Sequence, residues 1–234
     1  GHPLKAVEQD IDFAAMVPLQ VYNSLQNPIE RERLRRIRHL IIGGSAIDSA
    51  LARQLKDFPN AVWSTYGMTE TLSHIALRRL NGPEASDWYK PFEGVTVSSN
   101  AEGCLVIDAP LVHDGLLVTN DIVTINAEGC FKIRGRKDNV VCTGGIKVQM
   151  EEIETLLKPW LEKPFMITKR PDKKFGETIV LLTEEEEISK IKHICKACLP
   201  KYWQPHDYLY IDHIPLTETG KPARAAALSL AKEI

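Results

Sequence analysis

One stretch of the sequence, Thr65–Thr71, combines an aromatic ring, a glycine, three threonine hydroxyls and a carboxylate in the order Thr-Tyr-Gly-Met-Thr-Glu-Thr. It follows the apolar run Ala61–Trp63, so it is expected to begin where a β-strand ends. An aromatic face accepts a purine, a hydroxyl donates to a phosphate oxygen, and a carboxylate suits a hard cation. Ligands also favour the carboxyl ends of strands in α/β sheets. The stretch therefore favours a nucleotide site, with an ordinary strand-to-loop turn as the alternative.

Two further charged side chains stand where chemistry is plausible. Lys221 follows a glycine in the Thr-rich loop 214–222, where a lysine can deliver charge to a phosphate and withdraw again. Surface loops commonly carry lysine, so an unspecialised loop is the alternative. Asp121 lies between apolar strand residues and must face solvent or meet a partner, because burying a bare carboxylate is expensive.

These groups need strands and helices to position them, and the first half of the chain indicates a βαβ unit. Residues 39–42 read as a strand that ends at Gly43-Gly44-Ser45, and 61–66 read as the next strand. The segment 49–56 between them reads as a helix capped by Asp48, so the two strands should be parallel and end at one sheet edge. We therefore expect Gly43, Gly44 and Ser45 beside Tyr66 and Gly67. A Gly-Gly pair alone is more often a turn than a site.

The remaining elements follow from periodicity and turn residues. Pro18 should start a helix after a short buried strand, and 29–38 should be a surface helix. From about residue 91 the residue pattern changes to short alternating segments that are typical of antiparallel β-strands, with a hairpin turn at 126–129. Further elements are expected as follows: a hairpin around Gly144-Gly145, helix 149–157, strands 165–169 and 178–182, a helix from the acids 184–187 to Cys198, strand 208–211 and helix 224–231.

Composition excludes several classes of function. The 234 residues are 44% hydrophobic, enough for one large domain or two modest ones, and the net charge of -2 does not favour nucleic acid or an anionic membrane as partner. No run approaches the ~20 apolar residues of a membrane-spanning helix. The five cysteines predict reduced thiols and a cytoplasmic protein. Cys195 and Cys198 share one helical face and indicate core packing, not zinc.

The stretch 65–71 resembles the signature of the adenylate-forming acyl-CoA and aryl-CoA ligases, and the resemblance covers nearly all of the chain that follows. It implies an α/β fold in which the C-terminal part of a large AMP-binding domain, with a βαβ parallel sheet and a small antiparallel part, precedes a small mobile α+β domain. The implied boundaries are 1–135 for the large domain, 136–140 for the hinge and 141–234 for the small domain.

The resemblance also implies roles for individual residues. Tyr66 would stack on adenine, Thr69 would contact the α-phosphate and Glu70 would help to hold Mg²⁺. Asp121 and Arg136 would contact the ribose, and Asp138 would be the hinge. Lys221, Thr69 and Glu70 would form the catalytic set, and Gly144-Gly145 would enter the site for the thioester step. The implied nucleotide-binding set is Gly43, Gly44, Ser45, Thr65, Tyr66, Gly67, Met68, Thr69, Asp121, Arg136 and Lys221.

The sequence departs from the family pattern at three positions. Asn120 stands where the family usually has glycine, and because asparagine tolerates left-handed backbone we expect the turn to be preserved. Ile146 replaces a polar residue and Met150 replaces a helix-starting proline, which affects the geometry of the thioester step. Four basic side chains between strands are either contacts for the phosphates of coenzyme A or an exposed basic turn. They are Lys169, Arg170, Lys173 and Lys174.

The implied function is a two-step ligase that uses ATP, Mg²⁺, a small carboxylic acid and coenzyme A. The pattern is most similar to the 2-succinylbenzoate-CoA ligases of menaquinone synthesis, and other aryl or fatty acyl-CoA ligases share most of it. A non-catalytic nucleotide-binding homologue and a ligase that loads a carrier protein are the rivals. The family's Ser/Thr/Gly-rich phosphate loop is not found here, so we expect a C-terminal part of a longer ligase that adenylates poorly alone. The formation of a homo-oligomer is left open.

Overall fold

The computed structural model describes residues 1–47, 49–217 and 220–232 of the chain. The chain divides into two units: unit 1 comprises residues 1–119 and 123–132, and unit 2 comprises 120–122 and 133–234. Two strands, β8 (Leu116–Ile125) and β9 (Phe131–Arg136), contribute residues to both units. The predicted hinge segment 136–140 lies in unit 2, and its role as a hinge stays a prediction.

Unit 1 contains a five-stranded sheet in the order β1-β2-β3-β4-β5. Strands β1, β2 and β3 are parallel, and β4 and β5 are antiparallel to their neighbours. The strands are β1 (Phe13–Met16), β2 (His39–Ile42), β3 (Ala61–Gly67), β4 (His74–Arg79) and β5 (Lys90–Pro91); the helices are α1 (Pro18–Gln26), α2 (Pro28–Arg36) and α3 (Ser49–Leu55). Helix α3 connects β2 to β3, so the predicted βαβ unit is confirmed.

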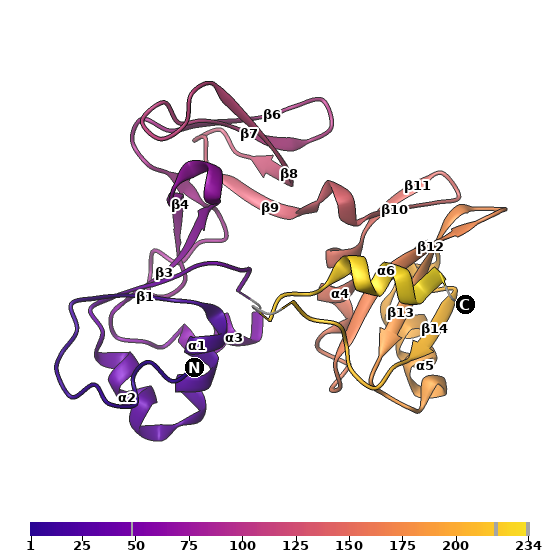
Figure 1. Ribbon diagram of the computed structural model, residues 1–234, viewed down its shortest axis with the longest axis horizontal. Helices are drawn as coiled ribbons and strands as arrows, with labels where there is room; N and C mark the ends of the chain where they lie inside the picture. Colours follow the sequence, from indigo (N-terminus) through magenta and orange to yellow (C-terminus); the bar gives the residue numbers. More distant parts are fainter. Residues whose placement is uncertain (48, 218–219, 233–234) are drawn as a thin grey trace. The chain divides into compact units, whose positions relative to one another are not determined.

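Alternation along the strands decides which face of this sheet is buried. Met16, Leu40, Ile42 and Val62 all point to one face and form a core with side chains of the three helices. Figure 1 shows these helices, drawn in indigo and purple, gathered near the strands. The residues between them, such as Ala15, lie on the other face, which is more open. Because side chains alternate with period two, neighbouring residues of β3 serve different faces.

A second sheet has the order β6-β7-β8-β9, with β6 (Thr96–Ser99) antiparallel to β7 (Cys104–Asp108). Asn126 builds the predicted turn between β8 and β9: its backbone carbonyl accepts from Gly129 N–H at 3.1 Å and its side chain accepts from Cys130 N–H at 2.9 Å. The prediction of antiparallel hairpins in this part of the chain is therefore confirmed for β6 and β7.

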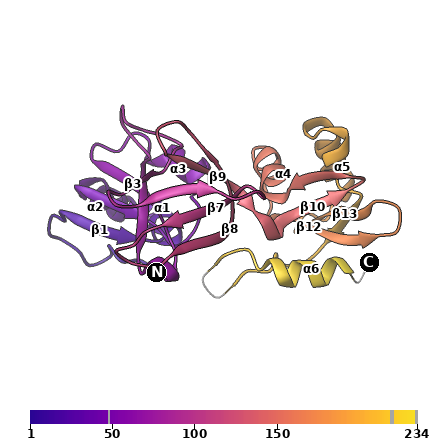
Figure 2. The same cartoon turned by 90° about the horizontal axis from the view of Figure 1, so that it is seen from above.

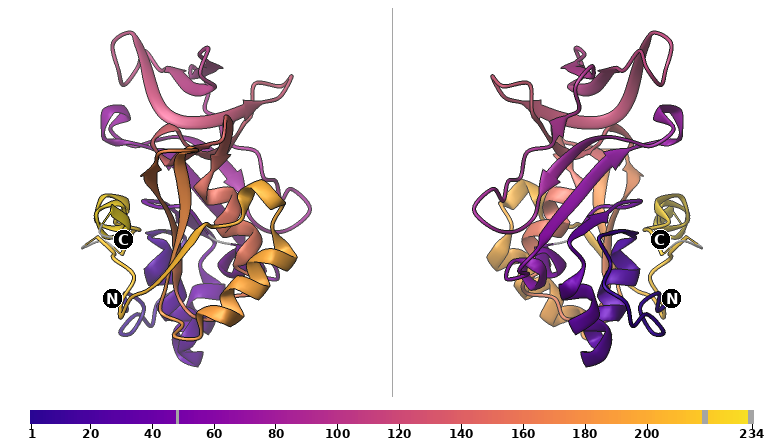
Figure 3. Two further views of the ribbon diagram at one scale, coloured as in Figure 1. Left: turned by 90° about the vertical axis from the view of Figure 1, so that its right-hand side faces the viewer. Right: turned by 90° about the vertical axis from the view of Figure 1, so that its left-hand side faces the viewer.

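Unit 2 contains a sheet in the order β11-β10-β13-β12, with β14 added in parallel to β13. Helices α4 and α5 pack on one face through a core that includes Ile153 and Ile191, and α6 packs on the other face through Ala227 and Ala231 (Figures 2 and 3). The elements are η2 (Lys137–Asn139), β10 (Val140–Thr143), β11 (Ile146–Gln149), α4 (Met150–Leu157), β12 (Phe165–Asp172), β13 (Gly176–Thr183), α5 (Ile188–Cys198), β14 (Asp207–Tyr210) and α6 (Arg224–Lys232).

The structure tests two expectations about unit 2. Helix α5 begins at Ile188, so the acids 184–187 precede the helix instead of forming its first turn. Cys195 is fully buried in the core of unit 2, as the core-packing prediction requires. Among the residues described, no helix is long and apolar enough to cross a bilayer. Asp48, predicted to cap α3, lies outside the described residues.

Candidate functional site

β2 and β3 are parallel and end side by side, as expected for strands joined by a helix. Ile42 pairs with Ser64, which brings Gly43 alongside Thr65 one residue further on. A Cβ atom added to Gly43 would overlap the hydroxyl oxygen of Thr65. Only glycine therefore fits at position 43 while Thr65 keeps this position, and the backbone of residue 43 lies bare at the sheet edge.

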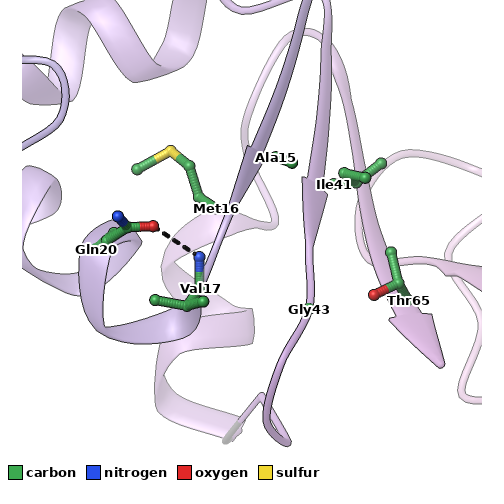
Figure 4. A pocket seen from close by; sticks show the side chains of 7 residues that line it. All are labelled: Ala15, Met16, Val17, Gln20, Ile41, Gly43 and Thr65. Carbon is green, nitrogen blue, oxygen red and sulfur yellow. Dashed lines mark hydrogen bonds between the residues drawn. The ribbon is translucent and has the colours of Figure 1, made fainter. Parts of the chain in front are cut away.

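A hollow of about 250 Å³ opens beside this contact, on the more open face of the sheet. Figure 4 shows its lining residues, which come from β1, α1, β2, β3 and the residues that directly follow β1 and β2: Ala15, Met16, Val17, Gln20, Ile41, Gly43 and Thr65. Most of the lining is apolar. The side chain of Gln20 accepts a hydrogen bond from Val17 N–H at 2.9 Å, so the start of α1 is held against the hollow.

A short 3₁₀ turn, η1 (Thr69–Thr71), presents two of the predicted catalytic residues. The hydroxyl of the buried Thr71 accepts from Met68 N–H at 3.1 Å and lies 2.7 Å from the carbonyl oxygen of Ser73. Thr69 and Glu70 are exposed at the outside of this turn. The inward threonine therefore holds a loop whose outward hydroxyl and carboxylate are free to meet a ligand that approaches from solvent.

Tyr66 lies in an aromatic cluster with Tyr89 and Phe131, and only 8% of its surface is exposed. Its ring meets Phe131 edge-on, with 5.1 Å between the ring centroids. Because it follows Thr65 in β3, its side chain points to the opposite face of the sheet from the hollow. Stacking of adenine on Tyr66 stays a prediction.

In unit 2, the two predicted ribose contacts lie together. Arg136 Nη1 is 3.3 Å from Asp121 Oδ1, and Arg136 Nη2 is 3.5 Å from Asp138 Oδ2. The Asp121 side chain is 14% exposed, whereas that of Arg136 is 52% exposed. A guanidinium between two carboxylates leaves donor capacity on its solvent side, since arginine carries five N–H groups.

The expectation for Asn120 is wrong. The residue lies inside β8, and Leu72 is the only non-glycine residue with positive φ among those described, so no left-handed turn is formed at position 120. Its side chain instead donates to Asp138 Oδ2 at 3.2 Å. Asparagine is present here as a hydrogen-bond donor to the predicted hinge residue.

Gly144 and Gly145 form the tip of the β10-β11 hairpin, with φ angles of 57° and 84° that favour glycine. Gly144 N–H donates to the carbonyl of Phe175 at 2.9 Å, so this tip is held by the turn between β12 and β13. In that turn region Lys169 Nζ lies 3.0 Å from Glu177 and Arg170 lies 2.8 Å from Asp207. Both of these basic side chains are thus already paired within unit 2.

Lys221 stands in a small hairpin between β14 and α6. Leu216 and Pro222 form a β-bridge, and Thr217 N–H donates to the carbonyl of Lys221 at 2.7 Å. Thr217 Oγ1 in turn accepts from Lys221 N–H at 3.1 Å. Lys221 is exposed, so its ammonium group faces solvent.

The chemistry of the donors fits Mg²⁺ held chiefly by a nucleotide. Glu70 is exposed, and among the described residues it belongs to no group of three or more side chains that could hold a metal ion. Mg²⁺ in phosphate-transfer sites commonly takes one or two carboxylates and completes its shell with water and phosphate oxygens. One exposed carboxylate beside a phosphate site is sufficient for that arrangement.

Sequence reasoning did not identify three residues that build these sites. Thr71 is part of the quoted stretch, and a threonine that can bond its own turn is a usable signal. Gln20 follows Pro18 at a helix start, the position from which a side chain reaches back to the preceding N–H. Arg224 bonds to Glu154, 70 positions earlier in the chain, so no local pattern pointed to it.

Comparisons with known proteins show which family the chain resembles. A family model described as AMP-binding enzyme matches residues 2–112. A crystal structure of an acyl-CoA synthetase (AMP-forming)/AMP-acid ligase II-like protein from Dyadobacter fermentans is 31% identical, with a TM-score of 0.58 over 96% of this chain and 67% of that chain.

Two curated proteins are more partial matches. Probable acyl-activating enzyme 4 of Arabidopsis thaliana is 29% identical over 70% of this chain, and 2-succinylbenzoate-CoA ligase of Lactococcus lactis is 24% identical over 80% of it. This chain spans 29% and 46% of the lengths of these two relatives.

Proposed function

Because this chain belongs to the AMP-binding enzyme family of AMP-forming acyl-CoA synthetases, we propose that the native protein is an ATP-dependent carboxylate-CoA ligase. In the first step a carboxylate oxygen of the acid attacks the α-phosphorus of ATP. The bond to the β-phosphate breaks, which gives an acyl-adenylate and pyrophosphate. In the second step the thiol of coenzyme A loses its proton and attacks the acyl carbon, and AMP leaves as the thioester forms.

The observation that carries this proposal is the juncture of β2 and β3. Gly43 leaves bare backbone beside Thr65, an apolar hollow opens next to it, and η1 presents Thr69 and Glu70 at the end of the same strand. A site for an acyl-adenylate needs these parts together: an apolar recess for the acyl group, backbone that a flat base can approach, and polar groups for the phosphate. Parallel strand ends are where α/β proteins place such sites.

In unit 1, Thr69 would donate to the α-phosphate, and Glu70 would be the protein ligand of Mg²⁺. The ion, when bound, supplies charge neutralisation on the phosphates. Thr71 contributes by holding both side chains outward. Gly44, Ser45, Gly67 and Met68 complete the proposed lining, and Tyr66 would contact adenine.

In unit 2, Asp121 and Arg136 would bind the ribose hydroxyls, since a carboxylate accepts from a diol and the adjacent guanidinium can donate. Lys221 would place its ammonium group between the acid's carboxylate and the α-phosphate during adenylation. Its contribution would be electrostatic stabilisation of the charge that develops on phosphate. Asp138, within 136–140, would be the hinge between the domains 1–135 and 141–234, and the Gly144-Gly145 tip would serve the thioester step.

For the acid itself, we propose 2-succinylbenzoate, which would give the protein a place in menaquinone biosynthesis. The curated relative from Lactococcus lactis is a 2-succinylbenzoate-CoA ligase, and the lining of the hollow is mainly apolar, as an aromatic acyl group requires. The described cysteines are all free thiols, which suits a reducing compartment such as the cytoplasm.

The test is a substrate and acceptor panel on the native protein. Acid-dependent exchange of pyrophosphate into ATP is measured with 2-succinylbenzoate, benzoate, and medium- and long-chain fatty acids. Thioester formation is then measured with free coenzyme A and with a phosphopantetheinylated carrier protein. The proposal expects exchange with 2-succinylbenzoate and thioester on free coenzyme A. Exchange only with fatty acids would overturn the substrate, and transfer only to the carrier would overturn the acceptor.

A further inference from the structure

Arg224 and Glu154 form a bidentate ion pair in unit 2. Arg224 is the first residue of α6 and Glu154 lies in α4. The two guanidinium nitrogens meet the two carboxylate oxygens, Nη1 to Oε1 at 2.6 Å and Nη2 to Oε2 at 2.7 Å. Each side chain is only 22% exposed. Bidentate pairs of this kind are stronger and more directional than single-contact ion pairs.

The pair is built into the edge of the sheet. Ile167 lies in β12, which pairs only with β13 and is therefore an edge strand. Its N–H donates to Glu154 Oε1 at 2.8 Å, and its carbonyl accepts from Arg224 Nη1 at 2.8 Å. The two side chains thus take the place of a neighbouring strand. Since α4 and α6 lie on opposite faces of the sheet (Figure 2), the pair joins them around this edge.

Arg224 also lies at the base of the hairpin that carries Lys221, and its backbone bonds to that hairpin. Arg224 N–H donates to the carbonyl of Pro222 at 3.1 Å, and Ala223 N–H donates to the carbonyl of Pro215 at 2.9 Å. These bonds are next to the bridge between Leu216 and Pro222, on the side away from Lys221. Lys221 is therefore three residues before Arg224, whose side chain is anchored. The Cα atoms of the two residues are at most about 11 Å apart.

We propose that Glu154 and Arg224 are positioning residues for Lys221: they clamp the base of its hairpin to the edge of β12, so that the ammonium group is delivered in a fixed geometry. The inference rests on the proposed role of Lys221 in adenylation. An unclamped hairpin would still carry its lysine, but the lysine would spend less time in the productive position. Small displacements of a catalytic group reduce rate strongly.

The test uses Glu154→Gln and Arg224→Lys in the native protein, with the two half-reactions measured separately. The first is acid-dependent pyrophosphate exchange, and the second is the consumption of preformed acyl-adenylate by coenzyme A. Only the first uses Lys221 in the proposed function. We expect kcat of exchange to fall about tenfold or more in Glu154→Gln, with the KM for ATP and the second half-reaction changed less than about twofold.

A second readout does not depend on activity. Hydrogen exchange of the Gly220 and Ala223 amides, which are bonded within the hairpin, should be faster in Glu154→Gln. Arg224→Lys keeps the charge and loses the bidentate geometry, so its effect should have the same pattern and be smaller. Glu185→Gln is the matched control: it makes the same chemical change in unit 2, at the pair with Lys163, and should alter neither half-reaction.

The outcomes separate the inference from the function on which it rests. If both half-reactions fall equally in both variants, the pair serves the fold and the inference is wrong. If Lys221→Ala abolishes exchange while Glu154→Gln exchanges at the wild-type rate, the positioning role alone is overturned. If Lys221→Ala exchanges normally, the proposed role of Lys221 fails, and with it the reason for a clamp.

Discussion

Gly43 and Thr65 lie side by side at the ends of two parallel strands, so close that residue 43 has no room for a side chain. The contact couples the loop after β2 to the strand that leads into η1. Any group that binds at this edge meets bare backbone from one strand and a hydroxyl from the next. The requirement for glycine here is steric, since a methyl group would occupy the position of the Thr65 hydroxyl.

Gly43→Ala should therefore lower stability by about 1–3 kcal/mol, the usual cost of overpacking, and raise the KM for ATP. Thermal unfolding and pyrophosphate exchange measure the two effects. In the Thr65→Ala background the same substitution should cost less, because the overlapping hydroxyl is gone. Equal costs in both backgrounds would show that the overlap does not limit position 43.

Thr71→Val keeps the shape of a buried side chain and removes the hydroxyl that bonds to the turn. We expect the free energy of unfolding to fall by about 1–3 kcal/mol, because Met68 N–H and the carbonyl of Ser73 lose their hydrogen-bond partner. Adenylation should fall by about tenfold to a hundredfold as Thr69 and Glu70 lose their fixed positions. Ser73→Ala removes an exposed neighbouring hydroxyl and is the control. A Thr71→Val enzyme with wild-type kcat would contradict this account of η1.

Asp121→Asn tests the ribose contact. If Asp121 accepts a hydrogen bond from the sugar, the KM for ATP should rise about tenfold, because bonds to charged acceptors contribute about 1.5–3 kcal/mol. A nucleotide that lacks the relevant hydroxyl has no such bond to lose. The KM values for 2′-deoxy-ATP and 3′-deoxy-ATP therefore locate the contact, since one of them should barely respond to the substitution. An equal rise for all three nucleotides would exclude a ribose contact.

Burial raises the pKa of the Cys195 thiol to about 11, the largest cause being removal from water, while the neighbouring Tyr208 acts in the opposite sense. At pH 8 only about one thiol in a thousand would be ionised. Cys195 should resist iodoacetamide at pH 8 in the folded protein and react after denaturation, whereas the exposed Cys142 should react in both states. Mass spectrometry of the labelled peptides measures this. Rapid labelling of Cys195 in the folded protein would show that the core of unit 2 is open.

Much of the fold could be predicted because its signals are local. Residues 39–42 form a strand with the predicted bounds, and Val141 pairs with Val148 across the Gly144-Gly145 hairpin as expected. In each case apolar alternation or a glycine turn specifies the structure within a few residues. The parallel arrangement of β2 and β3 followed from one topological rule, that strands joined by a helix are parallel and end at the same edge. The contact of Gly43 with Thr65 was not predicted, because the residues expected beside the Gly43–Ser45 turn were Tyr66 and Gly67.

The features that could not be predicted depend on contacts between distant residues. Asn120 is compatible with a left-handed turn by type, but pairing in β8 and a bond to Asp138 decided its conformation. Glu154 and Arg224 are 70 positions apart, and each alone is an ordinary charged residue on a helix. The basic side chains Lys169 and Arg170 likewise found acids on other strands, which no local pattern could show.

The most direct test of the central claim is acid-dependent pyrophosphate exchange by the native protein and its Lys221→Ala variant, with nucleotide binding measured in parallel. The account predicts exchange that requires the acid, a loss of about a hundredfold or more in the variant, and ATP binding that is nearly unchanged. ATP binding without any acid-dependent exchange in the wild-type protein would contradict it, since the chain would then belong to a nucleotide-binding protein that performs no ligation.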